Sequence, residues 1–280
     1  MRKLFLAAAL AAAAFAAGCG KDTKRDDASF RIPDSLISEI EKFRLTVDDY
    51  HVEKGGVMAN AQIELHYPAA EFSRFVAVKS FGYLKSAYEV VSKEIGRPAA
   101  GKLVVIGTAD LDEYKLMTRK EWWYYGVVKG DTIIFEPLDI MIRRMIAEPG
   151  ITNRVAQAAV NRRSGGRSPA WLREAVASRI ANEVEILKIQ MPEFEHEGRV
   201  MDPSPERIEE AIAEGAERGD SRVAYYAAYR MLENLLARHS MDNVLSFFDR
   251  LREGTTLDEA SVEAFGVSYA ALIGTIRIDG

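Results

Sequence analysis

Cys19 is the only cysteine of this 280-residue chain, and it limits how the chain can fold. It follows a positively charged start, an apolar run from Leu4 to Ala17, and Gly18. This order is typical of a secretion signal and its cleavage context, and the apolar run is too short to span a bilayer permanently. Because there is a single thiol, the chain can form neither an internal disulfide nor a thiolate-rich metal site. Its fold therefore depends on a packed core alone.

The segment Ala16–Cys19 (AAGC) resembles the lipobox of bacterial lipoproteins, in which signal peptidase II cuts before the cysteine and the cysteine is lipidated. Ala16 departs from the usual leucine of that motif. The alternative is an ordinary signal peptide with a chance cysteine near its cut site. The resemblance implies that residues 1–18 are removed and that Cys19 carries acyl chains such as palmitate. Gly20, rather than aspartate, implies an outer-membrane anchor facing the periplasm.

The mature chain divides into a short polar tether and one large domain. Residues 19–30 comprise the lipidated cysteine and a polar stretch (KDTKRDDAS) that is expected to be flexible. Residues 31–280 are long enough to form a globular domain with a substantial core. The whole chain has 48% apolar residues, which is usual for a globular protein. The net charge of -5 argues against a nucleic-acid partner.

The pattern of apolar residues predicts strands early in the domain and helices late. Strands are expected over residues 61–67, 102–107 and 132–136, with a helix over 72–95 between the first two. Another helix is expected after Thr108 as its N-cap, and nearly everything from residue 138 onward favours helix. Ser168-Pro169 and Ser204-Pro205 are typical helix starts, and Thr256 with Glu259 forms a capping-box pattern. This order indicates an α+β domain.

The run from Ser164 to Ser178 (SGGRSPAWLREAVAS) resembles the peptidase-MA-like domains of the gluzincin zinc metallopeptidases. In that family, segments similar to KLVVIGTADLDEY and WWYYGVVKGDTIIFEP precede an H-E-x-x-H helix and a helix beginning P-x-W-L-x-E-x-x-A. The closing helices resemble the runs that start at Ala224, Asn243 and Gly254. The resemblance covers the chain from about residue 60 to its end. It implies a gluzincin-like α+β fold with a small N-terminal sheet and a helical C-terminal half.

In active gluzincins the two histidines of H-E-x-x-H bind zinc, the glutamate between them acts as general base, and a glutamate on the next helix completes the site. By the resemblance, Glu174 occupies this last position. The preceding helix, over residues 151–163, contains no histidine; the best register places Arg154 and Ala158 at the histidines and Val155 at the glutamate. None of these three side chains can bind zinc or act as the base. The resemblance and these replacements imply an inactive relative with no catalytic residue, metal or cofactor.

Two hypotheses describe Arg154 and Glu174. In the first, the guanidinium of Arg154 fills the space of the zinc ion and pairs with the Glu174 carboxylate. In the second, both side chains are ordinary solvated residues on their helices. The distance between the two charged groups decides between these hypotheses.

No other catalytic or metal-binding motif stands out. The chain has four histidines, and none has a partner at the spacing of a metal site. The chain also lacks G-x-S-x-G, G-x-x-x-x-G-K and G-x-G-x-x-G elements, so a marked serine nucleophile, a P-loop and a dinucleotide site are not indicated. The four histidines are His51, His66, His196 and His239.

Two further features are candidates for binding. Four consecutive aromatic residues, Trp122, Trp123, Tyr124 and Tyr125, are candidates for lining a cleft, or else pack between a strand and a helix. A stretch rich in arginine is a candidate for binding anionic lipid or an acidic partner. The alternative is that its side chains are separately solvated or ion-paired. The arginines are Arg143, Arg144, Arg154, Arg162, Arg163, Arg167, Arg173 and Arg179.

These inferences predict a membrane-anchored envelope lipoprotein with a degenerate, non-catalytic metallopeptidase-like domain. Its expected role is peptide or protein binding or scaffolding, with the membrane and an envelope protein or peptide as partners. One alternative is an active metal-dependent peptidase with a non-standard site. Another is a subunit whose helices serve a partner complex.

Overall fold

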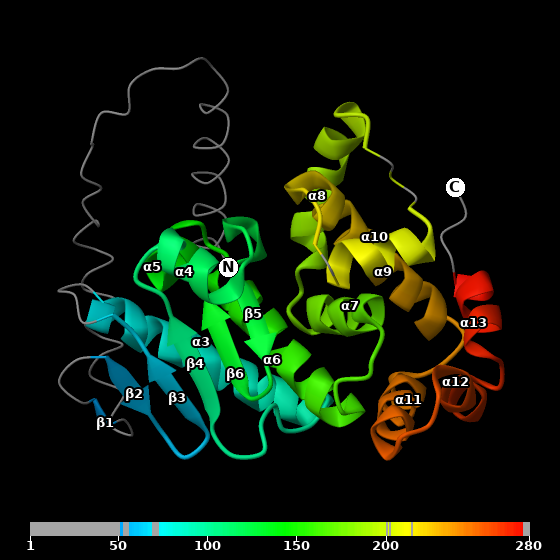
Figure 1. Ribbon diagram of the computed structural model, residues 1–280, viewed down its shortest axis with the longest axis horizontal. Coiled ribbons are helices and arrows are strands. Elements are labelled where there is room, and N and C mark those ends of the chain that lie inside the picture. The colour runs from blue at the N-terminus through cyan, green and yellow to red at the C-terminus, as the bar shows by residue number, and fades with distance from the viewer. Residues whose placement is uncertain are drawn as a thin grey trace, which may run out of the picture. The chain divides into compact units, whose positions relative to one another are not determined.

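A computed structural model describes residues 51–52, 56–68, 73–199, 201, 203–213 and 215–276 (Figure 1). They all belong to one compact unit, Ile40–Gly280. The predicted signal, the lipid attachment at Cys19 and the tether up to residue 30 lie outside the described residues. Across these described ranges, no helix has both the length and the apolar character needed to cross a membrane.

The sheet has six strands in the order β1-β2-β3-β4-β6-β5. The middle of the sheet, β3 to β4 to β6, is parallel, and the remaining neighbours are antiparallel. Strand β5 therefore forms one edge of the sheet. The strands are β1 (His51–Val52), β2 (Val57–Ala59), β3 (Ile63–His66), β4 (Leu103–Gly107), β5 (Gly126–Lys129) and β6 (Thr132–Phe135).

One face of the sheet is apolar because side chains alternate along each strand. Leu65 of β3 pairs in register with Val105 of β4, which pairs with Ile133 of β6, and all three are fully buried in the main core. Helix α3 (Ser73–Glu94) contacts β2 and β3, helix α6 (Ala147–Ser164) contacts β5 and β6, and the two helices pack against each other (Figure 1). The core between this face and the two helices fixes the position of α6.

The C-terminal half is helical. Helix α7 packs on α6 and α10, and α9 packs on both α7 and α10. The sheet region also contains α4 (Leu111–Thr118), the short 3-10 helix η1 (Trp122–Tyr124) and α5 (Leu138–Arg143). The later helices are α7 (Ala170–Ile180), α8 (Val184–His196), α9 (Pro205–Ala213), α10 (Arg218–Leu236), α11 (Met241–Glu253), α12 (Leu257–Phe265) and α13 (Tyr269–Ile276).

The α+β arrangement agrees with the prediction, with strands before Glu136 and helices after it. The expected strands appear as β3, β4 and β6, and the long helix as α3. Strands β1, β2 and β5 were not expected; β1 and β2 are two and three residues long, too short for a recognisable pattern. The predicted N-cap Thr108 is wrong by two residues: Asp110 caps α4 by accepting from the Glu113 amide.

The starts of α7 and α12 are fixed by polar contacts. The capping box of Thr256 and Glu259 is confirmed. Ser168 does not cap α7; instead, the Glu209 carboxylate of α9 accepts from the amides of Ala170 and Trp171, at 2.7 and 2.9 Å. This contact replaces a cap and ties the start of α7 to α9.

Candidate functional site

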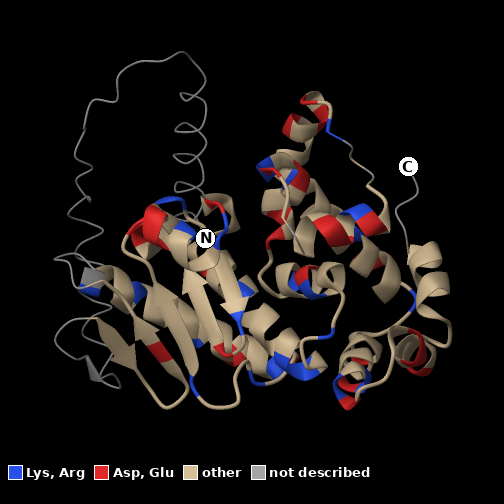
Figure 2. Cartoon of the chain, in the orientation of Figure 1, with Lys and Arg blue, Asp and Glu red and all other residues tan. Residues whose placement is uncertain are grey.

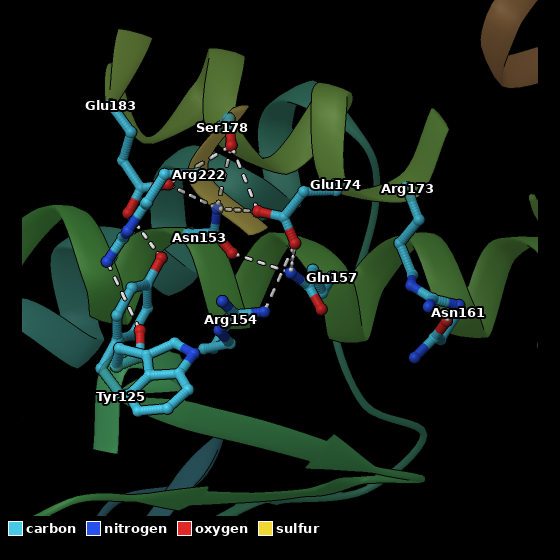
Figure 3. A network of polar contacts seen from close by, with 11 residues as sticks. Tyr125, Asn153, Arg154, Gln157, Asn161, Arg173, Glu174, Ser178, Glu183 and Arg222 are labelled. Carbon is cyan, nitrogen blue, oxygen red and sulfur yellow. Dashed lines mark hydrogen bonds and ion pairs between the residues drawn. The ribbon is translucent and has the colours of Figure 1, made fainter. Parts of the chain in front are cut away.

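The site expected from the sequence lies where α6 and α7 face each other. Residues three or four apart share one face of a helix, so each helix presents several polar side chains to the other. Together they form a buried network that we call the α6–α7 cluster (Figure 3). Its members are Tyr125, Asn153, Arg154, Gln157, Glu174, Ser178 and Glu183.

Both oxygens of the Glu174 carboxylate accept hydrogen bonds from amide side chains of α6. Asn153 Nδ2 donates to Oε1 at 3.0 Å and Gln157 Nε2 donates to Oε2 at 2.7 Å. Gln157 Nε2 also donates to Asn153 Oδ1, at 2.9 Å, which fixes the orientation of both amides. Ser178 donates to the same carboxylate from one turn further along α7. The buried Glu174 charge is thus compensated by amide and hydroxyl donors.

Arg154 supplies the positive charge of the cluster. Its Nη1 lies 3.6 Å from Glu174 Oε2, and both side chains are almost fully buried, with 6% and 3% of their surface exposed. The Arg154 guanidinium also lies over the ring of Tyr125, 4.7 Å from its centre, in a cation–π contact. The structure therefore shows the pairing of Arg154 with Glu174 that the first hypothesis requires.

A second carboxylate, Glu183, enters the cluster at the start of α8. Tyr125 donates its hydroxyl proton to Glu183 Oε1 and Asn153 Nδ2 donates to Oε2, both at 2.7 Å. Burial raises the pKa of Glu183, and the nearby Glu174 charge raises it further. The hydrogen bond from Tyr125 lowers this pKa, but by less. Asn153 lies between the two carboxylates and donates to both. It therefore holds two acidic groups together in one buried network.

Two of the three residues predicted at the H-E-x-x-H positions of α6 do not face Glu174. Val155 and Ala158, expected at the glutamate and second histidine positions, are buried in the apolar core instead. The two α6 residues four apart that face Glu174 are Asn153 and Gln157. The sequence signal for Asn153 and Gln157 is that an i, i+4 pair of amides on a largely buried helix needs polar partners.

The four aromatic residues take separate places. Tyr125 belongs to the cluster, and Tyr124 donates or accepts a hydrogen bond with Ser221 of α10 at 3.0 Å. Trp122 lies beneath the guanidinium of Arg144, 4.5 Å from its ring centre, and Trp123 lines a separate cavity near the end of α8. The residues predicted to line one cleft are thus divided between packing and different cavities.

A cavity of about 240 Å³ adjoins the cluster. Strand β5 contributes Gly126, Val127 and Val128 to one wall, and the segment around η1 and helices α6, α7, α9 and α10 contribute the others. The remaining lining residues are Lys120, Tyr124, Arg154, Gln157, Asn161, Arg173, Glu174, Ile212, Ala213 and Tyr225.

The arginine-rich stretch is mostly made of individually paired side chains. Arg163 bonds to Asp249 of α11 at 2.7 Å, Arg144 contacts Glu136, and Arg179 contacts Glu233 of α10. Arg162 and Arg163 lie at the C-terminal end of α6, where Figure 2 shows basic residues together. Cations are favourable at a helix C-terminus, which accounts for their position without a ligand.

Comparison with known proteins gives no family. No model of a known protein family matches the chain, and no curated protein matches it. In the part of the chain that the structure describes, no three His, Cys, Asp or Glu side chains gather as a metal site would require. The chemistry of this site is therefore argued from its own residues.

The residues of the cluster do not fit a zinc ion. Zinc sites in proteins use thiolate, imidazole and carboxylate donors, and the cluster offers two carboxylates, Glu174 and Glu183, but no thiolate or imidazole. Asn153 and Gln157 direct amide protons at the Glu174 carboxylate, and Arg154 places a fixed positive charge beside it. A divalent cation would meet hydrogen-bond donors and a like charge there.

A further buried carboxylate, Glu136, lies at the end of β6 beside the cluster. Its side chain is fully buried, and Arg144 Nη1 donates to Oε2 at 3.2 Å. Burial raises the pKa of Glu136 to about 7, although Arg144 lowers it. The neutral acid is therefore favoured by folding.

This raised pKa predicts a pH-dependent stability. The stabilisation from Glu136 is complete below its ordinary pKa of 4.5 and is lost as the pH rises through about 7. Glutamine at position 136 does not titrate, so Glu136→Gln avoids this loss. Between pH 4.5 and 8, the unfolding free energy of the unchanged protein should therefore fall relative to that of the variant by about 3 kcal/mol. Urea unfolding across this range measures the difference, and a constant difference would contradict the assignment.

Proposed function

We propose that this chain is a membrane-anchored envelope lipoprotein whose domain is a degenerate, non-catalytic relative of the gluzincin metallopeptidases. Its function in this proposal is to bind an extended peptide segment of another envelope protein. The order of elements supports the relationship, since a small sheet with edge strand β5 precedes two facing helices, and the second helix carries Glu174.

The observation that carries the proposal is the set of contacts to Glu174. Asn153 and Gln157 lie one helical turn apart and both donate to its carboxylate. Arg154, between them in sequence, lies 3.6 Å from the same group. The arrangement keeps the geometry in which two ligands on one helix meet a third on the next, but each ligand is replaced by a donor or a cation. Such a site can hold a ligand.

The binding surface in this proposal is the free edge of β5. Tyr125 O accepts from the Glu136 amide, and Val127 pairs with Ile134. Because hydrogen-bonded positions alternate along an antiparallel pair, Gly126 and Val128 direct their backbone groups away from β6. They also line the cavity beside the cluster. An extended peptide can therefore add to this edge as another strand while one of its side chains enters the cavity.

This proposal predicts that the backbone amide of Val128 is needed for binding. The full-length protein is titrated into fluorescent, capped pentapeptides of random sequence, and fluorescence anisotropy measures binding. Val128→Pro removes the outward N–H without touching the pairing with β6, and should weaken binding at least about tenfold. Val128→Thr keeps that N–H and should bind like the unchanged protein.

Equal binding by the proline and threonine variants would refute the role of the β5 edge. Absence of binding by the unchanged protein would refute peptide binding altogether. Cleavage of the peptides that stops on adding a chelator would instead establish the alternative of an active metal-dependent peptidase.

A further inference from the structure

We infer that the cavity beside β5 binds a carboxylate group of the ligand, with Arg154 as its main partner. The inference rests on the proposed function, because it names the chemistry of a ligand for the same site. The carboxylate comes from an acidic side chain or from the C-terminus of the bound peptide.

The cavity has the size and the charge for such a group. Its volume of about 240 Å³ is several times the roughly 30 Å³ that a water molecule takes up in the liquid. Three cationic side chains, Lys120, Arg154 and Arg173, line it against the one carboxylate of Glu174. The excess of positive charge favours an anion. A carboxylate is the anionic group that a bound peptide carries, on an acidic side chain or at its C-terminus.

Arg154 lacks the acceptors that a buried guanidinium needs. Its contact with Glu174, at 3.6 Å, is longer than a hydrogen bond. Its Nε and Nη2 are buried and have no hydrogen-bond partner within the described part of the chain. The ring of Tyr125 stabilises the charge but offers no oxygen lone pair to these protons.

This deficit indicates what the missing partner is. A guanidinium is a rigid planar group whose paired N–H donors match the two oxygens of a carboxylate. Leaving buried donors of a charged group unpaired costs more than leaving neutral ones unpaired. A carboxylate in the cavity supplies acceptors that the cluster itself does not provide.

Arg173 adds a second positive charge in the same cavity. Its Nη1 donates to Asn161 Oδ1 at 3.2 Å, which holds the guanidinium at the cavity wall. Burial lowers the pKa of Arg173; Glu174 and Glu209 raise it, and the positive charge of Arg154 lowers it again. An anion between Arg154 and Arg173 relieves the repulsion between these two cations.

The test compares three libraries of fluorescent pentapeptides with the full-length protein. The first is capped and has glutamate fixed at the centre; the second is capped and has glutamine there. The third has the glutamine centre and a free C-terminal carboxylate. The first or the third should bind at least about tenfold more tightly than the second, since a charge-assisted bidentate contact is gained. Tighter binding of the first library shows that a side chain supplies the carboxylate, and tighter binding of the third shows that a C-terminus does.

Arg154→Met should abolish this preference while the glutamine library still binds. Because the methionine leaves Glu174 without its cation, the double variant Arg154→Met with Glu174→Gln provides a charge-balanced second test, with the same loss expected. Equal binding of the three libraries by the unchanged protein would overturn the carboxylate site and leave peptide binding intact. A preference that persists in both variants would also overturn it.

A probe that needs no peptide separates the two proposals. Succinate is titrated into the ¹⁵N-labelled full-length protein, and the Nε–H resonance of Arg154, assigned by its loss in Arg154→Met, is followed. A saturating shift supports the carboxylate site even if no peptide library binds and the proposed function fails. An unmoved resonance, or tighter binding of inorganic phosphate at Arg154, would overturn the assignment to a carboxylate.

Discussion

Replacing Glu174 by alanine should lower the free energy of unfolding by about 3–5 kcal/mol, because it leaves a buried cation without its counter-charge. The substitution removes the anion beside Arg154 and the acceptor for Asn153 and Gln157 at once. All of these side chains are buried, so water cannot replace the lost contacts at low cost. Urea unfolding followed by circular dichroism gives the free energy.

A double variant separates the charge from the hydrogen bonds. Arg154→Met combined with Glu174→Ala removes both charges, so it should be less destabilised than Glu174→Ala alone by about 1–3 kcal/mol of coupling. Glu174→Gln keeps the shape and one acceptor and should fall between the unchanged protein and the alanine variant. A cost below about 1 kcal/mol for Glu174→Ala, the range of exposed ion pairs, would mean that the pair is not a buried one.

Introducing the H-E-x-x-H pattern at Asn153, Arg154 and Gln157, with Glu174 opposite, should create a zinc site. The triple variant Asn153→His, Arg154→Glu and Gln157→His places two imidazoles one turn apart on α6, opposite the carboxylate of Glu174. These residue types and this spacing are those of a zinc site. Mass spectrometry of metal content should find one zinc per chain, and adding Glu174→Ala should release it.

The matched control uses the register that the sequence alone suggested. Arg154→His, Val155→Glu and Ala158→His introduce the same three side chains, but two of them replace fully buried core residues. This variant should be strongly destabilised and hold no zinc, because a charged group and an imidazole would enter an apolar core. Zinc in the control but not in the triple variant would show that the α6 register is misassigned.

Much of the fold could be predicted because its signals are local. Strands β3 and β4 alternate between buried and partly buried residues, β6 is a short apolar run, and α3 has helical spacing over many residues. The short strands β1 and β2 depend on their neighbours more than on their own residues, so no sequence signal marked them. The cap of α7 was missed because its acceptor, Glu209, comes from a helix far along the chain.

The candidate site was predicted in part for the same reason. Glu174 and Arg154 were singled out, and the structure pairs them. Their amide partners Asn153 and Gln157 were not, because a search for metal ligands passes over amides. The register could not be fixed from the sequence, since α6 is buried on most of its surface and its apolar residues do not define a single face. Glu183 joins the cluster only through the turn between α7 and α8.

The measurement that tests this account most directly is the zinc content of the unchanged full-length protein, produced with zinc in the medium and purified without chelators. The account predicts no zinc above the buffer blank, since Arg154 holds the positive charge beside Glu174 and amide donors occupy the ligand positions. One zinc per chain that is lost on Glu174→Ala would contradict it, and would establish a metal site made of residues that include Glu174.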